Sequence, residues 1–397
     1  MSPSPSDVVI VAGARTPIGA FQGALASFTA PQLGSIAIRE ALRRAGVEGG
    51  EVDEAVMGSV LTGAMGQAPA RQAVLGAGLP ESVPCMTINK VCGSGMKAAM
   101  LAGQAIRLGD SKIVLAGGME SMSNAPYALD KARTGYRMGN GTLIDTMIHD
   151  GLWDPYNNCH MGNCGDATAA AESITREQLD AYAAESYRRA LAAQAEGRLS
   201  DEIVTVEVPQ RKGDPIRVSQ DEEPGKGDAS KLANLRPAFS KEGVTTAGNA
   251  SSINDGACAL VMTTREEAER RGLKPLGSLL ASTTHAQEPQ WFTTAPAFAI
   301  QRLLDKTGLK VSDVDLFEVN EAFAVVAMAV GNRVGIPSEK LNVNGGAVAL
   351  GHPIGMTGAR LILTALYELN RRGGKYAVAS PCIGGGEATA VLLAAEG

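Results

Sequence analysis

The chain has 397 residues, of which 45% are hydrophobic and 20% charged, and its formal net charge is −6 at pH 7. This length allows two or three domains around a large core, and the composition is typical of a globular protein. The negative charge argues against nucleic acid binding over the whole surface, and no apolar run is long enough to span a membrane. The six cysteines are sparse, and the first residues lack the pattern of a targeting peptide, so we expect a reduced, cytoplasmic compartment.

The first third of the chain alternates predicted strands and helices. Its apolar runs indicate buried strands, and its amphipathic segments end at Gly46 and Gly109, as helices commonly do. The strands are expected over 8–13, 54–60, 84–91 and 112–117, and the helices over 31–45 and up to Leu108.

The middle of the chain has a different, more polar composition. Its clearest element is a helix over 175–197, which begins with a capping box formed by Thr175 and Gln178. Because strands and helices do not alternate here, we interpret 122–252 as an inserted domain. The strand pattern returns at 256–263, so we assign 1–121 and 253–273 to an N-terminal domain.

The last part of the chain repeats the first, which predicts a second copy of the same βα-rich domain over 274–397. Each copy should contain a sheet with helices on its faces. The matching segments follow in the same order: 37–46 with 299–308, 52–53 with 314–315, 79–80 with 336–337, 87–89 with 342–344, and 111–118 with 374–381.

Cys92 stands between the strand 84–91 and the following helix, within the glycine-containing sequence NKVCGSG. A thiol at a helix N-terminus is expected to have a lowered pKa, because unpaired N–H groups and the helix dipole favour negative charge. The glycines would let another molecule approach the sulfur. Cys92 is therefore a candidate nucleophile, with an inert buried cysteine as the alternative.

Three further candidates lie in the second copy. Asn320 follows a strand at 316–319 and offers an amide donor, although it could simply cap a helix. His352 lies in a glycine-rich turn and suits the role of base for a thiol, although it could be a structural turn residue. Cys382 ends a strand before glycines 384–386, whose backbone N–H groups could hold an oxyanion, although the segment could be only a tight turn.

Together these groups favour acyl transfer through a thioester. One cysteine would be the nucleophile, the histidine its base, and the second cysteine would move a proton on carbon. Backbone and amide donors would hold the negative oxygen of an enolate or tetrahedral intermediate.

The four motifs closely resemble those of the thiolase family, over essentially the whole chain. They are NKVCGSG at 89–95, NEAF at 320–323, GGAVALGHPIG at 345–355 and CIGGG at 382–386. The resemblance implies an α/β fold of two similar domains in a five-layer α/β/α/β/α stack, with a loop domain inserted in the first.

The resemblance also implies a role for each candidate. Cys92 would be acylated, His352 would activate it, and Cys382 would deprotonate the second acyl-CoA. Asn320, through a water, would complete one oxyanion hole, and the N–H groups of Cys92 and Gly384 would form the other. The positions expected to contact coenzyme A or the acyl group are Leu152, His160, Met161, Leu235, Phe239, Ala247, Ala250, Ser251, Ala322 and Phe323.

Two positions depart from the family pattern. Phe292 stands where a methionine usually lines the pocket, and Lys226 replaces an arginine often found near the adenine of coenzyme A. The sequence His160-Met161-Gly162 is similar to the short-chain, biosynthetic branch. It favours condensation of two acetyl-CoA to acetoacetyl-CoA and CoA, and the reverse thiolysis. We expect no cofactor besides these substrates, no nucleic acid or membrane partner, and a homodimer or homotetramer.

The sequence leaves alternative interpretations open. A degradative 3-ketoacyl-CoA thiolase of broader chain length or a non-catalytic acyl-CoA-binding protein would share much of the pattern. The sequence GSGMKA at 93–98 also fits a weak dinucleotide-binding fingerprint, which would explain neither His352 nor Cys382. Cys159, His160 and Cys164 could suggest a metal site, but no second ligand pair is present, so we expect none.

Overall fold

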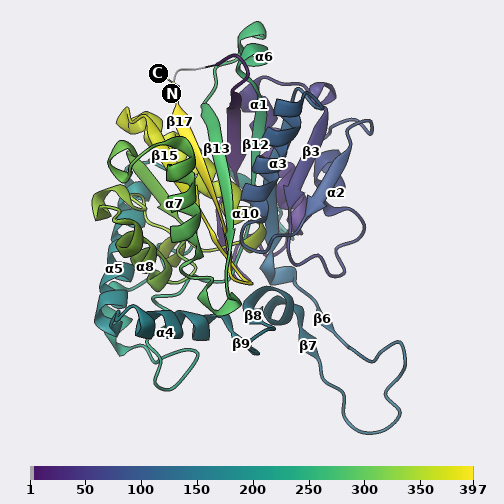
Figure 1. The fold of residues 1–397 in the computed structure, drawn as a ribbon. Helices are drawn as coiled ribbons and strands as arrows, with labels where there is room; N and C mark the ends of the chain where they lie inside the picture. The colour runs from purple at the N-terminus through teal and green to yellow at the C-terminus, as the bar shows by residue number, and fades with distance from the viewer. Residues whose placement is uncertain (1–3, 397) are drawn as a thin grey trace.

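The computed structural model describes residues 4–396 of the chain. An 11-stranded mixed sheet runs through it, with main strand order β14-β15-β17-β13-β1-β12-β5-β3-β4 (Figure 1). β2 pairs with β12 and β16 pairs with β17 beside this main path. The sheet consists of two halves, which meet where Val9 and Ile10 of β1 pair with β13.

The predicted elements of the first half form with small shifts at their ends. The helices end at Gly46 and Gly109, both in the left-handed conformation that glycine adopts readily. The strand expected over 84–91 is shorter, because the chain turns after Ile88. The first half contains β1 (Val8–Arg15), β2 (Gly19–Ala20), α1 (Ala30–Ala45), β3 (Glu54–Gly58), α2 (Pro69–Gly76), β4 (Cys85–Ile88), α3 (Ser94–Leu108), β5 (Val114–Ser121), β12 (Asn254–Thr264) and α6 (Arg265–Arg270).

The second half has a similar order of elements, although within residues 4–396 no strand between α8 and α10 corresponds to β4. It contains β13 (Gly277–Ala286), α7 (Ala295–Thr307), β14 (Leu316–Val319), α8 (Ala324–Val334), α9 (Ala347–Leu350), α10 (Ile354–Arg372), β15 (Tyr376–Ser380), β16 (Cys382–Ile383) and β17 (Glu387–Ala395).

Matching aspartates show that the two halves repeat one unit. Asp53 precedes β3, and its carboxylate accepts hydrogen bonds from the backbone N–H groups of Lys112 and Ile113. Asp315 precedes β14, and its carboxylate accepts from the N–H groups of residues 375 and 376. In each half the strand after the aspartate pairs in parallel with its neighbour.

The elements stack in five layers, as expected. α1 and α2 cover the first half of the sheet, and α7 with α8 covers the second. α3 and α10 pack against each other between the two halves. Glycines permit close packing against α10: a Cβ atom at Gly95 of α3 would lie 2.8 Å from the backbone nitrogen of Ala359, and one at Gly118 of β5 would lie 2.0 Å from the carbonyl oxygen of Gly355. The family-type α/β/α/β/α fold is therefore confirmed.

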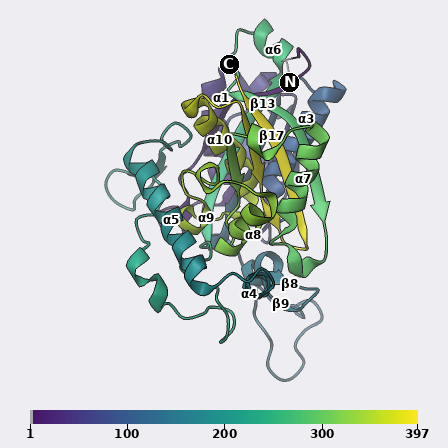
Figure 2. The ribbon, with the colours of Figure 1, turned by 60° about the vertical axis from the view of Figure 1, so that its left-hand side comes forward.

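The insertion between β5 and β12 supplies the remaining α-helices and strands. They are β6 (Tyr127–Ala128), β7 (Ile144–Asp145), β8 (Trp153–Asp154), β9 (Cys159–His160), α4 (Met161–Ala171), α5 (Arg176–Ala195), β10 (Val206–Val208) and β11 (Ile216–Val218). The chain between β6 and β7 extends away from the rest (Figure 1), and α5 lies beside α8 and α9 (Figure 2). The predicted capping box of Thr175 and Gln178 begins α5.

A buried ion cluster attaches this insertion to the sheet. Arg15 of β1 is fully buried; its guanidinium donates to Glu202 at 2.6 Å and to both carboxylate oxygens of Asp221 at 2.6 and 2.9 Å. Asp221 also accepts from the backbone N–H of Ile18. No helix in residues 4–396 is long and apolar enough to cross a membrane.

Candidate active site

Cys92 lies on a tight turn between β4 and α3. The preceding residue, Val91, has φ +46°, which is strained for a β-branched side chain. Ser94 holds this turn, because its hydroxyl accepts from the N–H of Lys90 at 2.8 Å and donates to the carbonyl of Val91 at 2.6 Å. The strained turn presents Cys92 to a cavity, as the sequence predicted for a nucleophile.

The prediction of a lowered Cys92 pKa was wrong. Burial raises the pKa of this thiol to about 11, and the charge of Glu120 adds to the rise. The backbone N–H groups of Gly384 and of Cys92 itself point toward the sulfur and oppose the rise, but they do not outweigh the loss of solvation. Cys92 is therefore a neutral thiol at pH 7 and needs a base.

His352 can supply that base. It lies in the turn between α9 and α10 and lines the same cavity as Cys92. Burial, with the nearby charge of Arg360, lowers the pKa of its imidazole to about 3, so the ring is neutral and can accept a proton. Asn320 Nδ2 lies 3.3 Å from Nε2 of this ring, and the backbone N–H of His352 donates to Asn254 at 2.8 Å.

Cys382 begins β16 and is fully buried. Burial, followed by the proximity of Cys92, raises the pKa of Cys382 well above its usual value. Backbone N–H groups of Cys382 and Ala322 point toward its sulfur and favour the thiolate. The structure thus brings two protonated thiols and a neutral imidazole together.

Most of the predicted contact residues meet in one cavity. The predicted residues that line it are Cys92, Leu152, His160, Met161, Phe239, Ala250, Ser251, Phe292, Ala322, Phe323, His352 and Gly384. Asn320 and Cys382 are buried beside it. The sequence did not single out five further residues of the cavity, and all but Met122 lie within two positions of a predicted residue. They are Met122, Gly151, Ser252, Ile253 and Ile354.

Three predicted contact residues do not line this cavity. Lys226 is exposed and pairs with Glu222 at 3.7 Å, and Ala247 is exposed. Leu235 packs near Gly248, where a Cβ atom would lie 2.7 Å from its side chain. Their contacts with the distant parts of coenzyme A stay predictions.

Aromatic rings form one wall of the cavity. His160 stacks on Phe239 with ring centroids 4.5 Å apart, and Phe323 makes edge contacts with Phe239 and Phe292 at 6.0 and 6.4 Å. His160 also caps α4, because its Nδ1 accepts from the N–H of Gly162. Burial lowers the pKa of His160, so this wall is uncharged and apolar at neutral pH.

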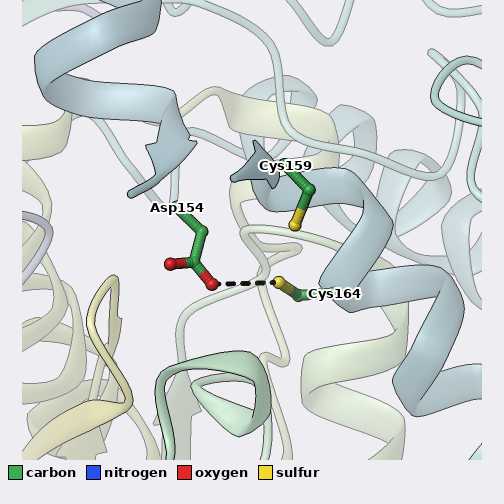
Figure 3. A group of neighbouring side chains, drawn as sticks. All are labelled: Asp154, Cys159 and Cys164. Carbon is green, nitrogen blue, oxygen red and sulfur yellow. Dashed lines mark hydrogen bonds between the residues drawn. The ribbon is translucent and has the colours of Figure 1, made fainter. Parts of the chain in front are cut away.

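Cys159 and Cys164 lie near Asp154 (Figure 3). Their ligand-type atoms all lie within 4.8 Å of one another. The Asp154 carboxylate already accepts from the backbone N–H groups of Tyr156 and Asn157 and from the Asn157 amide at 2.7 Å, and the Cys164 thiol contacts it at 3.9 Å. The carboxylate thus stabilises a turn. Burial raises the pKa of the Cys164 thiol to about 12. That no metal binds here stays a prediction.

Comparisons with known proteins find relatives over nearly the whole chain. The thiolase N-terminal domain model matches residues 8–266, and the thiolase C-terminal domain model matches residues 273–395. The chain is 54% identical to acetyl-CoA acetyltransferase 2 of Arabidopsis thaliana, over 99% of this chain and 98% of the relative. It is 49% identical to an acetyl-CoA acetyltransferase of Pseudomonas aeruginosa, over 98% and 100%. A probable acetyl-CoA acetyltransferase of Dictyostelium discoideum is 50% identical, over 97% and 93%. The chain belongs to the thiolase family.

Proposed function

We propose that the protein is an acetyl-CoA C-acetyltransferase. It condenses two acetyl-CoA into acetoacetyl-CoA and CoA, and it catalyses the reverse thiolysis. One observation carries this proposal: a neutral imidazole and two thiols of raised pKa lie together beside a small apolar cavity. The names of the relatives support the same acyl group.

The first half-reaction transfers an acetyl group to Cys92. Nε2 of His352 takes the proton of Cys92, and the thiolate attacks the thioester carbonyl carbon of acetyl-CoA. The N–H groups of Cys92 and Gly384, which point toward this sulfur, are suited to hold the oxygen of the tetrahedral intermediate. The carbon–sulfur bond to coenzyme A then breaks.

The leaving group also prepares the second base. Coenzyme A leaves as a thiolate and takes the proton of Cys382, so Cys382 becomes a thiolate while His352 keeps the first proton. The two protons are then accounted for: one leaves with CoA, and one remains on the imidazole. This transfer explains how a cysteine with a strongly raised pKa becomes a base only after the first acetyl group is in place.

The second half-reaction forms the carbon–carbon bond. The Cys382 thiolate takes a methyl proton from a second acetyl-CoA, and His352 with a water on Asn320 holds the resulting enolate oxygen. The Oδ1 atom of Asn320 has no hydrogen-bond partner among the described residues. The enolate carbon attacks the acetyl carbonyl, the bond to Cys92 breaks, and this sulfur regains its proton from His352.

The preference for a short acyl chain follows from the side chains that form the wall of the cavity. The rings of Phe292, Phe323 and Phe239, with buried Met161, favour a short acyl group over a long one. We further propose a cytoplasmic homo-oligomer that needs no cofactor besides its CoA substrates. A degradative thiolase of broader range is the alternative.

A chain-length series of thiolysis assays tests this proposal. Acetoacetyl-CoA and free CoA should yield acetyl-CoA efficiently, whereas a sixteen-carbon 3-ketoacyl-CoA should react far more slowly. Cys92→Ser is the control for background cleavage, since an unactivated hydroxyl is a poor nucleophile. Equal efficiency with both substrates would favour the degradative alternative, and no cleavage of either would refute the proposed enzyme.

A further inference from the structure

A buried hydroxyl contacts the side of the His352 ring that faces away from Asn320. The side-chain oxygen of Thr357 lies 2.7 Å from Nδ1 of His352, and both residues are buried. Thr357 stands in the first turn of α10, directly after the turn that carries the histidine. Because the ring is neutral, it carries one proton, and its two nitrogens must differ.

The hydrogen bonds around the ring indicate which nitrogen carries the proton. The Thr357 hydroxyl donates its single proton to the carbonyl oxygen of Pro353 at 2.9 Å, so its oxygen is left to accept from Nδ1. On the other side, the Asn320 amide nitrogen lies 3.3 Å from Nε2. An amide nitrogen only donates, so it pairs with an unprotonated Nε2.

We propose that Thr357 is a positioning residue that holds His352 in the tautomer with its proton on Nδ1. Nε2 then carries no proton, so its lone pair can take the proton of Cys92. The inference rests on the proposed function, in which His352 is the base for Cys92. It adds a residue that never touches substrate and acts through the imidazole alone.

Removing the acceptor should reverse the tautomer. In Thr357→Val, which keeps the shape of the side chain, a proton on Nδ1 would be a buried donor without a partner. Once the Asn320 amide turns over, a proton on Nε2 could instead pair with its Oδ1, which has no partner among the described residues. Losing one buried hydrogen bond of this kind corresponds to a factor of about 5 to 150 in population, and we expect a similar fall in the rate of Cys92 acetylation.

Imidazole ¹⁵N NMR of the ligand-free protein reads the tautomer directly. The chain has four histidines, so His352→Asn identifies the signal of interest. Wild type and Thr357→Ser should show a protonated Nδ1, and Thr357→Val a protonated Nε2. Thr364→Val is a matched control, because this buried threonine of the same helix bonds to Glu202 at 3.0 Å rather than to His352. It should leave the tautomer unchanged.

Each outcome decides the matter. A protonated Nε2 in wild type, or an unchanged tautomer in a folded Thr357→Val, would overturn the inference. Should the valine variant not fold, a protonated Nε2 in the wild-type spectrum would still overturn the inference. No substrate is present in this measurement, so a failure of the proposed function would appear separately, as a wild-type protein with protonated Nδ1 and no thiolase activity.

Discussion

Replacing Phe292 by alanine should change the acyl-chain preference. This side chain is 2% exposed, lines the cavity beside the reacting groups and contacts the ring of Phe323. Removing the ring opens space where a longer acyl chain can lie. Each additional buried methylene contributes about 0.8 kcal/mol, which is roughly a factor of 4 in kcat/KM. A six-carbon 3-ketoacyl-CoA has two more methylenes than acetoacetyl-CoA, so its relative kcat/KM should rise about 15-fold.

The variant also tests the structure in a second way. Loss of a buried phenylalanine should lower the free energy of unfolding by about 3–5 kcal/mol, so circular dichroism must first show that the variant is folded. Phe298→Ala is the matched control, because Phe298 is 41% exposed on α7 and stacks on His285 outside the cavity. Its chain-length ratio should equal that of wild type. An unchanged ratio in folded Phe292→Ala would refute the assignment of Phe292 to the acyl wall.

Three other outcomes follow from the same structure. Cys382→Ser should still accept an acetyl group on Cys92 but should not exchange deuterium into the methyl group of acetyl-CoA; exchange at the wild-type rate would exclude Cys382 as the carbon base. Burial raises the Cys92 pKa to about 11, so the thiolate fraction of Cys92 should grow with pH. Alkylation of Cys92 by iodoacetamide without substrate should therefore accelerate about tenfold per pH unit between about pH 7 and 10. A plateau in this rate below about pH 8 would indicate a preformed thiolate. Asp221→Ala should lower the free energy of unfolding in urea by about 3–5 kcal/mol, because it leaves Arg15 partly unpaired. Asp214→Ala, at an exposed position, should have little effect. Equal free energies of unfolding in the two variants would contradict the buried cluster.

Local patterns were sufficient to predict most of the fold. Hydrophobic periodicity with the terminal glycines Gly46 and Gly109 placed the first helices, since these signals depend only on neighbouring residues. The repeated segments predicted the second half of the sheet, and matching aspartates Asp53 and Asp315 confirm it. The strand before Cys92 was predicted too long because a strained turn at Val91 is not a feature of apolar periodicity.

The electrostatics of the site could not be predicted in the same way. The sequence placed Cys92 at a helix N-terminus and suggested a lowered pKa. Burial by distant segments instead raises the pKa of this thiol. Likewise, the neutral state of His352 depends on burial and on Arg360, which lies within α10. The cavity members Met122 and Ile253 lie at the two ends of the insertion and meet only in the folded chain. The spacing of residues along the sequence does not indicate which distant residues will line the same cavity.

The most direct test of the central claim is to locate the covalent acetyl group. The folded wild-type protein would be mixed with acetyl-CoA, quenched in acid and digested, and its peptides analysed by mass spectrometry. We expect one acetyl group on Cys92, its loss on addition of free CoA, and no acetylation of this position in His352→Ala over the same time. Acetylation of Cys382 in place of Cys92, or no acetylated cysteine in an active protein, would contradict the account.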